Sequence, residues 1–176
     1  MKHLELKNIF QDQKTDKMST QNKNYSLYNR EEVPNAKGLT FGIVVSEWNS
    51  NITNNLYNGA YNELIKCGVL THNIQRYNVP GSYELVFGAK VAAKANPNAI
   101  ICLGSIIKGE TNHFDVICEA VAMGIKDLNI KLNIPVIFGV LTDNNIEQAI
   151  NRSGGKYGNK GIEAAITAIK MSILNS

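Results

Sequence analysis

Apolar and polar residues form blocks along this chain that predict strands alternating with helices. The first apolar block, residues 39–45, is rich in β-branched side chains and predicts a strand. Apolar residues then recur at helical spacing, at Ile52, Leu56, Ala60 and Leu64. Thr53 lies where it could cap this helix. The alternation of strand and helix continues along the chain, which is typical of an α/β protein.

Three further strands are predicted, and their patterns differ. Residues 73–79 alternate apolar with polar side chains, which favours an edge position in a sheet. Residues 99–103 and 135–141 are nearly continuous apolar runs, as expected of parallel strands buried on both faces. The first block has the same character. We therefore expect the alternating strand at one edge of the sheet.

The segments between and after these strands predict helices and one glycine-rich link. The expected helices cover residues 83–94, 113–129 and 162–171, and a short one capped by Asp143 or Asn144 runs through Ile150. The glycine-rich residues 153–158 link this short helix to the last one. The last helix is apolar over more than one face, so a partner subunit is expected to cover the excess.

These elements predict a right-handed, three-layer α/β sandwich around a four-stranded parallel sheet of strand order 2-1-3-4. The folded domain is expected to cover residues 38–176. Residues 1–37 are rich in Lys, Asn, Gln, Asp and Ser, and this composition predicts a flexible polar extension. Met18 within it is either the start of the protein or part of a longer extension.

Composition narrows the classes of function. The formal net charge of +3 is small, and the lysines are dispersed rather than interleaved with aromatics, so no nucleic-acid partner is expected. No apolar run approaches the roughly 20 residues of a membrane span. The N-terminus is charged where a signal peptide would be apolar. We therefore expect a cytoplasmic protein without membrane association.

The sequence does not predict a metal ion or a cofactor. Its three cysteines are widely spaced in apolar or helical contexts, which indicates reduced core thiols. Its three histidines fall on separate elements without the spacing of metal ligands. The turn at residues 46–50 has no glycine, so the dinucleotide-binding fingerprint is absent. Residues 154–161 lack the Gly-Lys-Ser/Thr step of an ATP-binding loop.

The strongest candidate for a functional site follows the third strand. Gly104 and Gly109 are expected to loosen the backbone there before the next helix begins. The N–H groups of Gly109, Glu110 and Thr111 would point outward at the start of that helix, where its dipole favours a phosphate. The same dipole disfavours the cation of His113, which leaves a neutral imidazole able to move protons.

The other strands also carry side chains suited to ligand binding. Trp48 follows the first strand, residues 82–84 follow the second, and Phe138 lies in the fourth. Ligands of open α/β sheets bind where the strands end, so we expect these groups to converge on one rim. Each of these residues also has a simpler explanation without a functional role. Trp48 and Phe138 could be core aromatics, Glu84 could be a solvated carboxylate, and His113 and Arg152 could be surface residues.

Six blocks of the sequence match a known family in order and spacing. They are Phe41–Val45 (FGIVV), Val79–Glu84 (VPGSYE), Gly109–Phe114 (GETNHF), Val136–Thr142 (VIFGVLT), Ile146–Ile150 (IEQAI) and Gly158–Gly161 (GNKG). The chain therefore resembles the 6,7-dimethyl-8-ribityllumazine synthases from about Leu39 to Leu174. The resemblance implies a flavodoxin-like strand order. It also implies a cofactor-free condensation of 5-amino-6-(D-ribitylamino)uracil with 3,4-dihydroxy-2-butanone 4-phosphate, the penultimate step of riboflavin synthesis.

The resemblance also implies a role for each residue of the site. His113 would donate and accept protons. The pyrimidinedione and its ribityl chain would be bound by Trp48, Ser82, Tyr83, Glu84, Ser105, Ile106 and Ile107 and, from the neighbouring subunit, by Phe138. The phosphate would be bound by Lys108, Glu110, Thr111 and Arg152. The expected partners are the two small-molecule substrates, further copies of the chain in a homo-oligomer of pentamers, and riboflavin synthase.

The chain departs from the family pattern at three positions. Trp48 stands in place of the more usual phenylalanine, Lys108 in place of arginine, and Asn151 where glutamate is frequent. None of these changes removes a chemical function, because an indole offers more stacking area and lysine keeps a cation near the phosphate. Two alternatives stay open: a flavin or lumazine carrier module, and a shell-forming protein that has lost catalysis.

Overall fold

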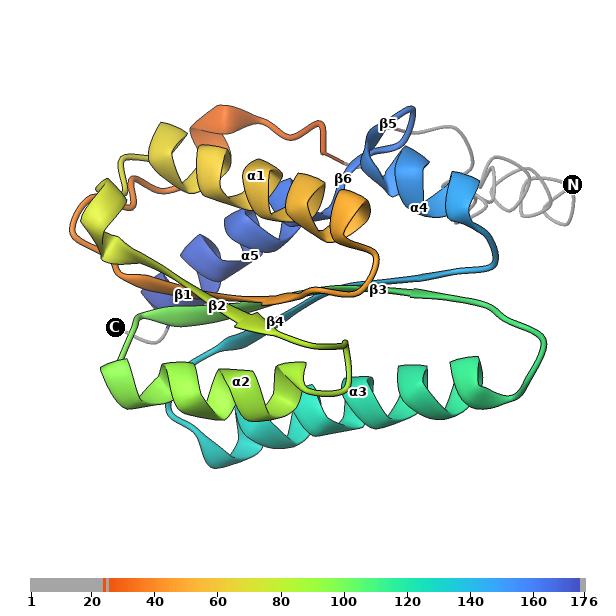
Figure 1. Cartoon of the computed structure of the whole chain (residues 1–176). Coiled ribbons are helices and arrows are strands. Elements are labelled where there is room, and N and C mark those ends of the chain that lie inside the picture. The colour runs from red at the N-terminus through yellow and green to blue at the C-terminus, as the bar shows by residue number, and fades with distance from the viewer. Residues whose placement is uncertain (1–23, 25, 175–176) are drawn as a thin grey trace, which may run out of the picture.

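A four-stranded parallel sheet organises the molecule (Figure 1). The computed structural model describes residues 24 and 26–174. The strands are β1 (Phe41–Ser46), β2 (Ile74–Val79), β3 (Ala99–Ile107) and β4 (Val136–Asp143). Their order is β2-β1-β3-β4, which confirms the predicted α/β class and topology. The alternating strand β2 lies at an edge, as its sequence predicts.

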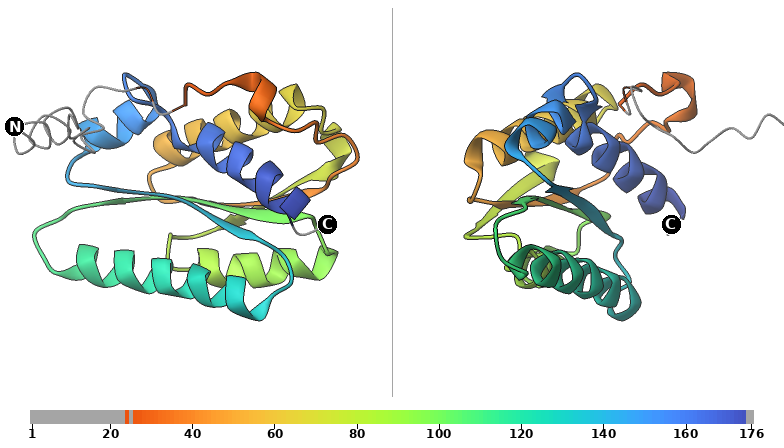
Figure 2. Two further views of the ribbon diagram at one scale, coloured as in Figure 1. Left: turned by 180° about the vertical axis from the view of Figure 1, so that it is seen from behind. Right: turned by 90° about the vertical axis from the view of Figure 1, so that its right-hand side faces the viewer.

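Helices cover both faces of this sheet (Figure 2). They are α1 (Ser50–Lys66), α2 (Leu85–Ala92), α3 (His113–Lys131), α4 (Ile146–Arg152) and α5 (Lys160–Leu174). Helices α1 and α5 pack on one face, and α2 and α3 pack on the other. Three short 3-10 helices lie at Arg30–Glu32, Thr71–Asn73 and Ala93–Ala95. The expected glycine-rich link forms a small antiparallel hairpin, β5 (Ser153–Gly155) with β6 (Gly158–Asn159).

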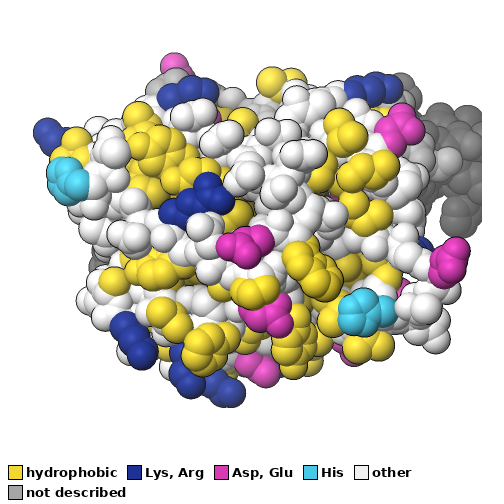
Figure 3. Space-filling model, viewed as in Figure 1, with side chains coloured by type: hydrophobic (Ala, Val, Ile, Leu, Met, Phe, Trp, Pro, Cys, Tyr) yellow, Lys and Arg dark blue, Asp and Glu magenta, His cyan; other side chains and the backbone are white. Residues whose placement is uncertain are grey.

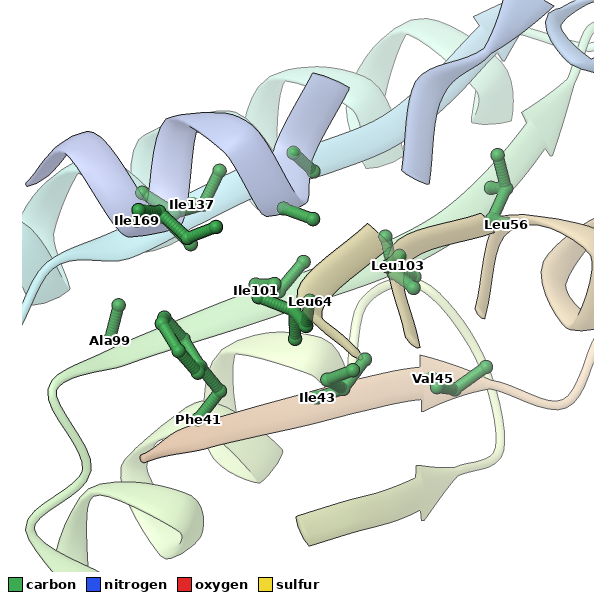
Figure 4. Packing of buried hydrophobic residues seen from close by; sticks show 14 of the residues in the cluster. Phe41, Ile43, Val45, Leu56, Leu64, Ala99, Ile101, Leu103, Ile137 and Ile169 are labelled. Carbon is green, nitrogen blue, oxygen red and sulfur yellow. The ribbon is translucent and has the colours of Figure 1, made fainter. Parts of the chain in front are cut away.

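Alternate residues of the buried strands fill two separate cores. Phe41, Ile43 and Val45 of β1 pack with Ile101 and other side chains beneath α1 and α5 (Figure 4). Residues of opposite orientation, such as Val44, pack against α2 and α3. Every residue of β1 is buried. Burial on both faces explains why the central strands are continuous apolar runs in the sequence.

Strand β3 extends four residues beyond the apolar run that predicted it. Gly104 does not loosen the backbone as expected, because it lies inside the strand and pairs with Val140 of β4. A Cβ at Gly104 would lie 2.7 Å from Ser82 Oγ and 2.9 Å from Leu85 Cδ1. Glycine is therefore required here for the close packing of the β2–α2 link against β3.

Two predicted helix caps are wrong. Helix α4 is capped by Asn145, whose side-chain oxygen accepts the N–H of Gln148, and neither Asp143 nor Asn144 has this role. Asp143 is the last residue of β4, which runs two residues further than predicted. Thr53 is buried inside α1, and that helix is preceded instead by Asn49.

Part of the segment predicted as a polar extension packs on the domain. Residues 1–23 and residue 25, and with them Met18, lie outside the described residues. Residues 26–37, here called the N-terminal strap, run along the outer side of α1 (Figure 1). Ala36 is fully buried and its N–H donates to Cys67 O at 2.8 Å. The sequence did not predict this contact.

The N-terminal strap is also attached at its first residues. The hydroxyl of Ser26 donates to the carbonyl of Asn159 at 3.0 Å and accepts the Asn159 N–H at 2.5 Å. The hydroxyl of Tyr28 donates to the buried carboxylate of Glu63 on α1. These bonds join the strap to α1 and to the β5–β6 hairpin.

The α2–α3 layer exposes an extensive set of large apolar side chains, several of which reach the surface over α2 in Figure 3. This α2–α3 face consists of Tyr83, Phe87, Val91, Val116, Met123 and Ile130. A cavity of about 380 Å³ opens between the two helices and is lined in part by Tyr83, Phe87 and Leu128. The predicted excess of apolar side chains on α5 is confined to its last turn, at Met171, Ile173 and Leu174.

Candidate functional site

The carboxyl ends of the four parallel strands lie at one end of the sheet, on the right in Figure 1. We call these ends, with the loops that follow them, the rim. The loop after β1 carries Trp48, the link after β2 carries Ser82, and the turn after β3 carries His113. The parallel topology thus brings these three segments of the chain to the same end of the sheet.

The turn after β3 presents backbone donors to solvent. Lys108 N donates to Asp143 O at 2.9 Å, which ties the start of the turn to β4. The hydrogen bonds of the described residues include none donated by the backbone N–H groups of residues 109–111, which are exposed. His113 is the exposed first residue of α3, and its N–H donates to Thr111 Oγ1 at 3.4 Å. The turn therefore has donors to offer beside a histidine, and its binding of an anion stays a prediction.

Gly109 in this turn has room for a side chain. A Cβ there would meet no heavy atom within 4 Å, and the backbone is not in the left-handed region. The described residues therefore make no steric demand for glycine at this position. The space next to Gly109 is open, so a ligand could approach its backbone closely.

Trp48 is presented at the surface by a well-bonded loop. Trp48 is 72% exposed, so it is not a core aromatic. The N–H of Glu47 donates to Val79 O at 2.8 Å, and the N–H of Trp48 donates to Pro80 O at 3.1 Å. The loop after β1 is thereby tied to the link after β2, and it holds an exposed ring at the rim.

The β2–α2 link brings three predicted residues to the rim. Ser82 is buried, whereas Tyr83 and Glu84 are exposed. Helix α2 begins at Leu85, two residues later than predicted, so all three lie before the helix. The Glu84 carboxylate lies over Gly81, where a Cβ would be 2.9 Å from its Oε2. Its simpler explanation as a solvated helix-start carboxylate stays compatible with this position.

The last residues of β3 have one edge without a strand partner. Pairing with β1 ends at Leu103, opposite Val45, while pairing with β4 continues to Ile107. Ser105 is buried, and Ile106 and Ile107 are half-buried. The β1-side edge of this stretch therefore carries no strand ladder, and the carbonyl of Ser105 accepts the side-chain amide of Asn49 there at 2.9 Å. Ligands of open α/β sheets bind beyond the carboxyl ends of the strands, and this edge lies there.

Three buried oxygens without a hydrogen-bond partner among the described residues also lie at strand ends. They are Ser46 Oγ, Ser105 Oγ and Asp143 Oδ2, at the ends of β1, β3 and β4. An unsatisfied buried polar group costs about 1–3 kcal/mol, so such groups are rare unless they serve a purpose. Burial raises the pKa of Asp143, and the nearby Arg152 opposes this shift.

Arg152 is held in an ion-pair cluster at the end of α4. Its Nη1 and Nη2 atoms lie 2.9 Å and 3.2 Å from the two carboxylate oxygens of Glu163, and Nη1 also donates to Tyr157 O. Lys160 Nζ lies 3.2 Å from the same carboxylate. Arg152 is only 18% exposed and is not an ordinary surface residue. Glu163 and Lys160 were not predicted from the sequence as part of the site, although their spacing of three residues on a helix was a signal.

The side chain of Asn159 joins three elements behind this cluster. Its Nδ2 donates to Asn55 O of α1 at 2.9 Å and to Ser153 O of β5 at 3.1 Å. Its Oδ1 accepts the N–H of Gly161 at 2.8 Å. These bonds fix the hairpin that follows Arg152 against the start of α5. We call Arg152, Glu163, Lys160 and Asn159 the arginine corner.

Phe138 does not converge on the rim of its own chain, contrary to the sequence argument. Strand β4 begins at Val136, so Phe138 lies near its amino end and pairs with Cys102. It lies five positions before Asp143, a distance of about 17 Å along a strand. Its side chain is 36% exposed, so it is not a fully buried core aromatic either. The predicted role of Phe138 in a neighbouring subunit's site stays a prediction.

The described part of the chain contains no group of three or more His, Cys, Asp or Glu side chains placed to hold a metal ion. Cys67, Cys102 and Cys118 form no disulfide, and burial raises the pKa of Cys102 to about 12. Only Cys102 is fully buried. None of the described helices is long and apolar enough to cross a membrane.

Comparison with known proteins gives a consistent result. The family model described as 6,7-dimethyl-8-ribityllumazine synthase matches residues 38–176. The synthase of Flavobacterium johnsoniae is 58% identical over 158 residues, which cover 89% of this chain and 83% of that protein. The synthases of Cytophaga hutchinsonii and Christiangramia forsetii are 57% and 55% identical over 88% and 89% of this chain, and 97% and 95% of their own lengths.

Proposed function

Since the chain belongs to the 6,7-dimethyl-8-ribityllumazine synthase family, we propose that the rim of its sheet forms the active site of that enzyme. The enzyme condenses 5-amino-6-(D-ribitylamino)uracil with 3,4-dihydroxy-2-butanone 4-phosphate to 6,7-dimethyl-8-ribityllumazine. Phosphate and water are released, and the reaction is the penultimate step of riboflavin biosynthesis. The proposal concerns which residues perform this chemistry.

The turn at residues 109–111 carries the proposal. Its exposed N–H groups make no bond within the described residues and lie at the start of α3, where the helix dipole favours an anion. We assign the butanone phosphate to this turn, with Glu110 and Thr111 donating through their backbone. The open space at Gly109 supports a close approach of the phosphate to the backbone. Lys108 supplies a nearby cation.

The pyrimidine substrate is assigned to the β1 side of the same rim. Trp48 offers an exposed ring on which the pyrimidinedione stacks. The stretch of Ser105, Ile106 and Ile107, which has no β1 partner, supplies backbone hydrogen bonds beside the one that Ser105 O accepts from Asn49. Ser82, Tyr83 and Glu84 bind the pyrimidine and the ribityl hydroxyls, a role supported by their place on the adjoining link.

His113 is assigned the proton transfers. The 5-amino group attacks the ketone, water leaves to form an imine, and phosphate is eliminated to leave an enol. The enol tautomerises to a ketone, and the ribityl-bearing nitrogen attacks that carbonyl to close the second ring with loss of water. A histidine beside the phosphate turn is suited to donate and accept these protons near neutral pH. Holding two substrates together can remove about 7–11 kcal/mol of a barrier in favourable cases, so positioning is expected to supply most of the rate.

The site is proposed to be shared between subunits of a pentamer. The apolar α2–α3 face supports an assembled state, because such a surface is costly to leave in water. In a ring of head-to-tail contacts, His113 of one subunit would meet Arg152 and Phe138 of its neighbour. Larger assemblies of pentamers and association with riboflavin synthase rest on the family resemblance alone. The cytoplasmic location likewise remains part of the proposal.

Two experiments test this reading. The purified protein is mixed with both substrates, and formation of the fluorescent lumazine is followed against the spontaneous reaction. No product above that background would favour the carrier module over the enzyme.

Co-expression of His113→Ala with Arg152→Ala then tests the shared site. In a randomly mixed ring, about a quarter of the interfaces combine an intact His113 from one subunit with an intact Arg152 from its neighbour. Activity should therefore return. Mixed oligomers that stay as inactive as the separate variants would exclude shared sites.

A further inference from the structure

Asn49 has an unusual place before α1. Its backbone is left-handed, with φ 58° and ψ 44°, whereas residues preceding a helix are ordinarily extended. An asparagine there usually accepts a helix N–H through its side chain, but Asn49 makes no such bond. Its side-chain amide instead donates to the backbone carbonyl of Ser105 at 2.9 Å. The amide is used to cross to β3 rather than to cap the helix.

The register of the sheet explains why Ser105 accepts this bond. Strand β1 pairs with β3 only as far as Leu103, opposite Val45. Two residues later, the β1-side edge of β3 has no strand beside it. The side chain of Asn49 takes the place of the missing strand at Ser105.

The loop that carries Trp48 is consequently tied on two sides. The N–H groups of Glu47 and Trp48 bond to Val79 O and Pro80 O, toward β2. The amide of Asn49 bonds in the opposite direction, to β3. Trp48 lies between these attachments with most of its indole exposed. An exposed aromatic ring keeps a fixed place only if its backbone is held in this way.

We propose that Asn49 is a positioning residue that fixes Trp48 at the rim and thereby sets the affinity for the planar pyrimidine substrate. Its left-handed backbone turns the chain, and its amide anchors the turn to Ser105. Asparagine combines both properties, because aspartate tolerates the conformation without offering a donor and glycine has no side chain. The inference rests on the proposed stacking role of Trp48.

Two substitutions separate the backbone from the amide. Asn49→Asp keeps the shape and the tolerance of left-handed backbone but replaces the donor with a carboxylate. Asn49→Gly keeps the backbone conformation and removes the side chain. Asn96 provides a matched control, because it is also left-handed, with φ 51° and ψ 49°, and lies just before the amino end of β3. Asn96→Asp and Asn96→Gly should behave like the unmodified protein in substrate binding.

The single tryptophan of the chain makes the test direct, since all indole fluorescence comes from Trp48. Both Asn49 variants should show lower fluorescence anisotropy of the ligand-free protein at unchanged oligomer size. The KM for the ribitylaminouracil should rise roughly tenfold, as expected for loss of a hydrogen bond that holds a binding group. The KM for the butanone phosphate should stay within about twofold, because a rise in both would indicate a general structural effect.

The outcomes distinguish this inference from the proposal on which it rests. Unchanged anisotropy and KM in both Asn49 variants would overturn it, as would equal changes in the Asn96 variants. Stacking itself is tested in the unmodified protein, by adding the pyrimidine substrate alone and following quenching of Trp48. Absence of quenching would overturn stacking, whereas the anisotropy of the ligand-free variants would still decide whether Asn49 holds the loop.

Discussion

The phosphate turn at residues 108–113 and the arginine corner contrast in how their polar groups are bonded. In the turn, the backbone donors of residues 109–111 are exposed and bond to no group of the described residues. In the corner, Arg152 has both ends of its guanidinium on Glu163, and Asn159 makes three side-chain hydrogen bonds. The turn is open to a ligand, and the corner is already organised by its own chain.

This difference indicates a division of labour between binding and support. Donors without internal partners lose no intramolecular bond when a phosphate arrives. An arginine locked by a carboxylate keeps its orientation but shares its charge, and the cluster of Arg152, Lys160 and Glu163 carries a net charge of about +1. The corner is thus suited to present a fixed cationic surface. Substitutions in the two regions should therefore affect different quantities.

The largest effect is expected at the open turn. His113→Ala should lower kcat by roughly 10²–10⁴-fold, the usual contribution of a positioned acid or base. Its thermal stability should hardly change, because the side chain is exposed. Steady-state kinetics and a thermal melt measure the two quantities. His72→Ala is the matched control, since it removes an exposed histidine outside the rim, and an equal loss there would contradict the proton role.

The arginine corner should respond in both activity and stability. Arg152→Ala should raise the KM for the butanone phosphate by roughly 10–100-fold, since a charged partner of the phosphate is lost. It should also lower the free energy of unfolding by about 1–3 kcal/mol, because the half-buried Glu163 loses its two bonds from Arg152 and keeps only Lys160 as a paired charge. Arg76→Ala on β2 is the control, as it removes an arginine bonded to Asn54 and Asn78. If Arg152→Ala bound the phosphate substrate normally, the corner would have only a structural role.

Two glycines contrast a packed position with an open one. Gly104→Ala should lower the free energy of unfolding by about 1–3 kcal/mol, because its Cβ would overlap Ser82 and Leu85. Gly109→Ala should leave stability unchanged and raise the KM for the butanone phosphate a few-fold, about the effect of a lost close contact. Denaturant titration and kinetics read the two effects. A stability loss at Gly109 would mean that the turn is packed rather than open.

Asp143 joins the two regions, and its expected effect is the smallest. Burial raises its pKa above the ordinary 3.8, so ionisation is less favourable in the folded chain than in the unfolded one. Its contribution to stability is therefore complete at low pH and is lost as the pH rises through the raised pKa. The free energy of unfolding of Asp143→Asn, taken relative to that of the unmodified protein at the same pH, should therefore increase from acidic to neutral pH. Urea titrations at pH 4 and pH 7 measure this gain, and a relative loss at pH 7 would contradict it.

Features set by one segment at a time were predictable from the sequence. The apolar runs identified the central strands, and the polar alternation of residues 74–79 placed β2 at the edge. The parallel order then implied a rim, and with it the turn before His113. These inferences need only local periodicity and the rule that ligands bind where parallel strands end.

Features that depend on a distant partner were not predictable. The sequence alone predicts that Gly104 ends the third strand. In the structure it continues β3, because it pairs with β4 and because Ser82 fills the space where a side chain would lie. The sequence gives no sign that Glu163 is more than a surface charge. Its pairing with Arg152 arises because the β5–β6 hairpin brings the start of α5 beside the end of α4. The choice of Asn145 over Asp143 as a cap depends on where β4 stops. Each outcome is decided by contacts far apart in the sequence, which periodicity does not report.

The N-terminal strap has a consequence for the order in which the chain folds. Its bonds between Ser26 and Asn159 join residues 133 positions apart, so closing this contact restricts almost the whole chain. Closing so long a loop has an entropic cost. This cost is smallest once β1, α1 and α5 have already come together and shortened the free chain between the two residues. The strap is therefore expected to dock after the rate-limiting step of folding. Bonds of that kind slow unfolding while leaving the folding rate unchanged, so the strap would lengthen the lifetime of the folded chain.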